Sequence, residues 1–145
     1  MDWNVLFDTV GLPALLGWAV LIAAPRGIWW LDMLPRVVIP LGLSVVYSGL
    51  ILAFMAQSGG GFGSIAEVRA LFASDPVLVA GWVHYLAFDL LIGCFLAARL
   101  DAAGVGRIVQ APVLVVTFLL GPLGLLIGLL TEAAATWQMK RRITA

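Results

Sequence analysis

Two titratable side chains lie near the middle of one long apolar segment, and their types suit acid-base chemistry. The segment covers residues 77–98 and contains His84 and Asp89. At a rise of about 1.5 Å per residue, Asp89 would lie about 3 Å from the segment midpoint and His84 about 5 Å on its other side. Desolvation favours the neutral form of an ionisable group, so an acid and an imidazole at this depth are suited to exchange protons. We therefore predict both as catalytic residues; the alternative is a structural role in packing and hydrogen bonding.

Residues around this pair predict a surface that binds a ligand. Trp82 and Tyr85 share the helical face of Asp89 through their three- and four-residue spacing. The segment 35–56 places three hydroxyl side chains on one face, where they could bond Asp89, a ligand hydroxyl or a neighbouring helix. The segment 111–131 carries a row of glycines, which suits close helix packing or a smooth slot for a flat or rod-shaped ligand. The predicted ligand-binding residues are Trp82, Tyr85, Tyr47, Ser44, Ser48 and Gly124.

The composition indicates that the solvent of these segments is a lipid bilayer. Of 145 residues, 63% are hydrophobic and 11% are charged, against about 45–50% and about 25% in an ordinary soluble domain. Lys+Arg and Asp+Glu are both 8, a balance that excludes a basic nucleic-acid-binding domain. The single cysteine forms no intrachain disulfide, and the single histidine excludes a metal site with two imidazoles. Because Lys140, in the C-terminal tail, is the only lysine, a retinal Schiff base within the membrane is also excluded. We expect no cofactor and no metal.

Four segments are long and apolar enough to cross a membrane, which takes about 20 residues. Each must be a helix, because an open strand would leave peptide groups unpaired in lipid. We therefore predict an all-α integral membrane four-helix bundle that forms a single domain over residues 1–145, with the first helix kept as a span rather than cleaved as a signal peptide. Pro122 predicts a kink in the fourth helix. The predicted spans are residues 3–24, 35–56, 77–98 and 111–131.

The connection between the second and third spans predicts a short helix at the membrane interface. Ser64 and Glu67 have capping-box spacing, and apolar residues recur at helical intervals over residues 65–72. The glycine-rich stretch 58–63 is interpreted as a turn rather than a phosphate-binding loop, since no lysine follows it. In the first connection, Trp29 and Trp30 are expected to anchor the chain at the interface.

Four spans would place both termini on the same side of the membrane. Counted in that way, each side receives four Lys or Arg residues, so the charge rule for membrane orientation does not decide between the sides. The basic cluster at residues 140–142 favours cytoplasmic termini.

Three segments of the chain resemble the abscisic-acid-deficient-four-like family, whose plant members are called neoxanthin synthases. They are W-V-H-Y-L-A-F-D-L at 82–90, the stretch from Pro40-Leu41-Gly42 to Tyr47, and G-P-L-G-L-L at 121–126. The likeness extends from about residue 25 to about residue 131. It carries over His84 and Asp89 as functional positions and Trp82 as a member of the motif. No plastid transit peptide is expected before the first span, so the chain looks like a bacterial-type member in an inner (plasma) membrane.

The resemblance implies a role in carotenoid (xanthophyll) metabolism. The plant reaction isomerises an epoxide to an allenic alcohol, so an epoxide oxygen gains a proton while a polyene carbon loses one. Such an isomerisation needs an acid and a base but no redox cofactor. The expected partners are membrane lipid and a carotenoid or related isoprenoid, with no nucleic acid and with a homo-oligomer left open. The alternative function is a non-catalytic protein that binds carotenoid or lipid, or that assembles a membrane complex.

Overall fold

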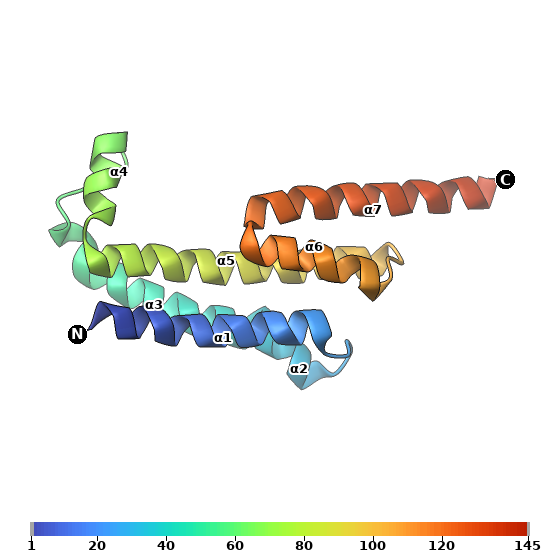
Figure 1. Ribbon diagram of the computed structural model, residues 1–145, viewed down its shortest axis with the longest axis horizontal. Coiled ribbons are helices and arrows are strands. Elements are labelled where there is room, and N and C mark those ends of the chain that lie inside the picture. Colours follow the sequence, from blue (N-terminus) through green and yellow to red (C-terminus); the bar gives the residue numbers. More distant parts are fainter. Residues whose placement is uncertain (1, 145) are drawn as a thin grey trace.

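The computed structural model describes residues 2–144, and this part of the chain is helical without a strand. Three long helical segments lie along the long axis of the molecule, and they contain α1 (Trp3–Ala23), α3 (Ile39–Phe54) and α5 (Asp75–Ala102) (Figure 1). α5 is the central element, because it contacts α1, α3, α4, α6 and α7. Its side chains form much of the core, including the fully buried Leu90 and Leu96.

Three helices are long and apolar enough to cross a membrane: Trp3–Ala23, Trp29–Gln57 and Asp75–Ala102. The second is composite, since α2 (Trp29–Met33), a π-helical turn (Leu34–Val38), α3 and a 3-10 turn (Met55–Gln57) follow without a break.

The second helix therefore begins six residues before the predicted 35, and it includes Trp29 and Trp30, which were expected in a connection. Prolines 35 and 40 lack the backbone donor that a regular helix needs. The wider π turn, in which the Ile39 N–H bonds the Leu34 carbonyl, keeps the chain helical through this region.

The predicted fourth span at 111–131 is wrong, because the chain reverses within it. α6 (Arg107–Leu119) is followed by Leu120, which has non-helical angles (φ −142, ψ 57), and α7 (Gly121–Thr144) begins directly afterwards. Figure 1 shows that α7 turns back alongside α6, so the two helices form a hairpin. We call this pair the α6–α7 hairpin.

Contacts with α5 fix the direction of each arm of the hairpin. Along α7, Gly121 lies against Asp89 and Gly128 lies against Leu96, so α7 runs parallel to α5. Along α6, Gln110 bonds Asp101 and Phe118 accepts from Tyr85, so α6 runs antiparallel to α5. The hairpin turn thus lies beside the middle of α5, and both arms lead back to the same end of the molecule.

Three features explain why the helix reverses rather than only kinking. Pro122 has no N–H to donate to the Phe118 carbonyl, four residues earlier. The Tyr85 hydroxyl donates to the Phe118 and Leu119 carbonyls instead, at 3.2 and 3.3 Å. Gly124 then allows the arms to close, since a Cβ at this position would overlap the Thr117 backbone.

Because of this hairpin, α1 begins at one end of the molecule and α7 finishes at the other (Figure 1). The expectation that both termini lie on the same side is therefore wrong. The end where α1 begins, which we call the acidic end, holds Asp2, Asp8, Glu67, Arg69 and Asp75. The opposite end, which we call the basic end, holds the other seven cations: Arg26, Arg36, Arg99, Arg107, Lys140, Arg141 and Arg142.

Polar contacts hold the helices together at the basic end. The Arg107 guanidinium donates to the Ala24 and Ile22 carbonyls at 2.7 Å, which satisfies the last turn of α1. Arg26 lies 3.1 Å from Asp101, and the buried amide of Gln110 bonds both residues. Partial burial lowers the pKa of Arg26, while the Asp101 carboxylate acts in the opposite direction.

The predicted short helix between the second and third spans is confirmed as α4 (Ile65–Phe72). The Ser64 hydroxyl accepts the Glu67 N–H at 3.2 Å, and the Glu67 carboxylate accepts the Gly63 N–H at 3.0 Å. The glycine-rich stretch forms the turn that leads into α4, with Gly59 at a φ of +70. α4 points away from the axis of the long helices (Figure 1); its position at a membrane interface stays a prediction.

Candidate functional site

Asp89 is a buried carboxyl group in the middle of α5. Its side chain is 7% exposed and lies against Gly121, where α7 begins. The Oδ2 atom is fully buried and has no hydrogen-bond partner among the described residues. A buried polar atom without a partner is rare and often marks a functional position. Because Asp89 lies against the first residue of α7, the positive end of the α7 helix dipole stabilises its carboxyl group.

Tyr85 connects this carboxyl group to the hairpin turn. Tyr85 lies one helical turn before Asp89 on α5, and its hydroxyl group interacts electrostatically with the Asp89 carboxyl group. The same hydroxyl donates to the carbonyl groups at the end of α6. Trp82 stacks on the Tyr85 ring with a centroid distance of 5.2 Å and an interplanar angle of 23°. The predicted shared face of these three residues is therefore confirmed.

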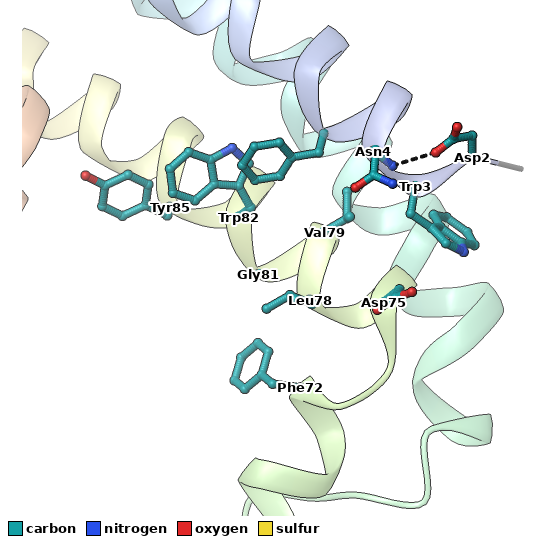
Figure 2. Close-up of a pocket in the computed structure, with 11 residues that line it drawn as sticks. Asp2, Trp3, Asn4, Phe72, Asp75, Leu78, Val79, Gly81, Trp82 and Tyr85 are labelled. Atoms are coloured by element: carbon teal, nitrogen blue, oxygen red, sulfur yellow. Dashed lines mark hydrogen bonds between the residues drawn. The ribbon is translucent and has the colours of Figure 1, made fainter.

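A groove between α1 and α5 leads from the acidic end to Tyr85. Its outer part has a volume of about 700 Å³ and lies between the first turns of α1 and the start of α5 (Figure 2). Its inner part, of about 290 Å³, is bounded by α1, α5 and the hairpin turn. Trp82 and Tyr85 line both parts, so we treat them as one feature, the α1–α5 groove. From Asp75 to Tyr85 it follows α5 for about 15 Å.

The groove has an aromatic wall between two polar ends. Phe7 stacks on Trp82 at 5.0 Å and Trp82 stacks on Tyr85, so three rings follow one another along the wall. Figure 2 shows Asp2 and Asp75 at the outer end, far from the Tyr85 hydroxyl at the inner end. This arrangement fits an elongated apolar molecule that carries polar groups at its ends.

His84 lies on a different face of α5 from Asp89. Its side chain is exposed, stacks on Phe88 at 4.4 Å and lies 5.5 Å from the Tyr47 ring on α3. Neither part of the groove is lined by His84. Five residues along a helix correspond to a rotation of about 140° from the starting direction. The fold therefore does not bring the two predicted catalytic residues together, and a role of His84 stays a prediction.

The other predicted binding residues lie away from the groove. Ser44 donates to the Pro40 carbonyl of its own helix at 2.7 Å, and Ser48 is exposed on α3. Tyr47 belongs with His84. Gly124 does not line a slot, because it packs against the backbone of Thr117 within the hairpin.

Sequence reasoning missed three residues that shape the site. Phe7 extends the aromatic wall, Phe118 provides both a groove contact and an acceptor for Tyr85, and Gly121 gives Asp89 its space. Pro122, one residue after Gly121, could have indicated this region. A proline that breaks a helix within the membrane leaves backbone carbonyl groups that need hydrogen-bond donors from neighbouring residues.

Metal coordination has no candidate in the described part of the chain, where no three His, Cys, Asp or Glu side chains gather. The inner part of the groove offers a ligand ring faces and one hydroxyl group, that of Tyr85.

Fold and site together define a class: a small all-helical protein with three candidate membrane spans and a helical hairpin that reverses beside a buried acid. The sequence pattern of the ABA DEFICIENT 4-like (ABA4-like) family matches residues 5–127. The chain belongs to this family, which confirms the resemblance of its three motif segments. The match includes Asp89, the hairpin turn and the groove apart from Asp2, Trp3 and Asn4, and it ends within α7. No match is found among the curated proteins, and none among the solved structures.

Proposed function

We propose that this protein acts in carotenoid (xanthophyll) metabolism and binds the ring end of a carotenoid or related isoprenoid in the α1–α5 groove. The observation that carries the proposal is the aromatic wall, which leads from the acidic end to the Tyr85–Asp89 pair. Flat rings and conjugated chains pack well against such a wall. The volumes of the two parts are also of the order expected for ligand pockets, about 300–1000 Å³.

The inner end of the groove offers the acid that an isomerase needs. Among the residues that line it, Tyr85 is the one with a hydroxyl proton, and Asp89, one helical turn further along α5, interacts with it electrostatically. A ligand oxygen at this point would receive a proton from Tyr85, which Asp89 would replenish. In an epoxide-to-allene isomerisation a polyene carbon also gives up one proton. The Asp89 carboxylate, ionised once it has reprotonated Tyr85, would take this proton up, so the pair is restored without a redox cofactor.

A non-catalytic carotenoid-binding function is the second candidate, and one observation favours it. The acid-base pair predicted from the sequence is not assembled, because His84 lies outside the groove. A protein that only holds pigment needs the wall and the polar ends but no base.

Pigment analysis in a carotenoid-producing bacterial host tests both candidates. We expect extracts from cells with the protein to contain an isomerised carotenoid that is absent without it. Gly11→Phe should abolish this product, because Gly11 lines the inner groove and has open space in front of it. Gly42→Phe, at an exposed glycine on α3 with equally open surroundings, is the matched control.

The outcomes of this experiment are distinct. Pigment that copurifies unchanged, and is lost in Gly11→Phe, would support the binding function instead of the isomerase. If the protein neither changes nor retains any pigment, both candidates are contradicted.

For orientation, we propose that the basic end lies on the cytoplasmic side of a bacterial plasma membrane. Seven of the eight Lys and Arg residues lie at that end, all within short connections or near helix ends. An excess of this kind determines membrane orientation. The C-terminal end of α7 would then be cytoplasmic, and the start of α1 would be on the outside.

Cysteine labelling checks this orientation, and the native Cys94 is buried. In intact spheroplasts, a membrane-impermeant maleimide should label Phe62→Cys, at the acidic end, but not Gln138→Cys, near the end of α7. Both positions are exposed. Both should react after permeabilisation, and labelling of Gln138→Cys alone in intact cells would reverse the assignment.

A further inference from the structure

A second pocket lies at the basic end, between the last turns of α5 and the middle of α7, apart from the groove. Its volume is about 370 Å³. It combines two cations with apolar surface: its lining includes Arg99, Lys140, Glu132, Thr136, Leu129 and Trp137.

Arg99 is held in place while part of its guanidinium is left available. Its Nε donates to the Glu132 carboxylate at 2.6 Å, which fixes the side chain against α7. Its two terminal nitrogens have no acceptor among the described side chains, and the residue stays about half exposed. A guanidinium in this position can bind a phosphate oxygen with its remaining donors. Lys140 provides a second positive charge on the same pocket.

The apolar part of the pocket continues along α7 towards the hairpin turn. Leu129 lines the pocket, and Leu126 and Leu130 are exposed beside it, so acyl chains could follow α7 away from the cations. At the other side, the Arg141 guanidinium lies 3.9 Å from the centroid of the Trp137 ring. Tryptophan and arginine side chains close to the end of a membrane helix, such as Trp137 and Arg141, are typical of the head-group region of a bilayer.

We propose that this pocket binds the head group of an anionic phospholipid, with the phosphate between Arg99 and Lys140. Basic pockets between membrane helices on the cytoplasmic side bind anionic head groups, and the basic end supplies the field that attracts them. A lipid suits the pocket better than a free phosphate because three of its seven lining residues are apolar and its apolar side leads towards the hydrocarbon region.

Native mass spectrometry of the detergent-purified protein tests this site, with phosphatidylglycerol and phosphatidylcholine added in turn. We expect the wild type to retain phosphatidylglycerol preferentially. Lys140→Gln should weaken this preference about fivefold, the effect of one cation near a lipid surface. The double variant Arg99→Gln/Glu132→Gln should weaken it similarly, since it removes the cation while leaving no unpaired carboxylate.

Arg69→Gln is the matched control, because Arg69 is the one Lys or Arg side chain among the described residues of the acidic end. It should bind phosphatidylglycerol like the wild type. Equal retention of both lipids by the wild type, or full retention by the pocket variants, would overturn the proposal. Displacement of the lipid by soluble glycerol phosphate would also overturn it, because the phosphate alone would then be recognised. Lys140 is exposed, so its variant keeps the test valid even if the double variant fails to fold.

Discussion

Substitution of Gly124 by valine is expected to prevent the α6–α7 hairpin from closing and to destabilise the protein strongly. A Cβ at Gly124 would overlap the backbone of Thr117, and backbone atoms cannot move aside as a flexible side chain can. Overpacking of a core commonly costs about 1–3 kcal/mol, and we expect at least the upper part of that range. The midpoint of unfolding in detergent, followed by circular dichroism, measures the effect.

Gly49→Val is the matched control for this prediction. Gly49 also lies inside a helix, but a Cβ there would have nothing within 4 Å. It should unfold close to the wild type. If both variants unfold at the same midpoint, the close contact between the arms of the hairpin is not what stabilises it.

Asp89→Asn is expected to abolish the conversion of the carotenoid, with a loss of about 100-fold or more, which is a typical contribution of a general acid. Asparagine has nearly the same shape, so the contact with Gly121 is kept while the acidic proton is lost. The pigment analysis described above measures the loss, and the amount of folded protein in the membrane checks that the variant is assembled. Conversion at the wild-type rate would exclude Asp89 as the source of the proton.

His84→Ala decides between the two arrangements of the site. The hypothesis based on the sequence alone requires conversion to be lost in this variant too. The geometry predicts that conversion persists, because His84 is exposed and lies outside the groove. Loss of conversion in His84→Ala with full conversion in Asp89→Asn would place the chemistry on the face of α5 that contacts Tyr47.

The long helices could be predicted because length and hydropathy determine them. The predicted and observed limits of α1 differ by one residue, and α4 was found through its cap. The hairpin could not be predicted in the same way, since hydropathy records whether a segment is apolar but not the direction in which it runs. Pro122 indicated a local break, whereas the reversal also depends on Tyr85, which is far away in the sequence.

The site was predictable where it depends on spacing within one helix. Trp82, Tyr85 and Asp89 share a face because helical periodicity requires it. Contacts between helices were not predictable, because the sequence does not show whether the Ser44 hydroxyl bonds a group on another helix or, as observed, the Pro40 carbonyl of its own helix. For the same reason Gly124 was predicted to line a ligand slot, whereas it packs against Thr117 of the neighbouring helix.

The Tyr85 hydroxyl has a single proton, for which a ligand oxygen would compete with the carbonyl groups at the end of α6. It now donates to the carbonyl groups that end α6, and a ligand oxygen that bound it would take this donor from them. Occupancy of the groove and closure of the hairpin are therefore thermodynamically linked, and each must alter the equilibrium of the other by the same factor. A ligand that binds about 15 Å inside the groove would in this way shift the equilibrium between open and closed hairpin, and so the position of α7, which carries the basic residues 140–142.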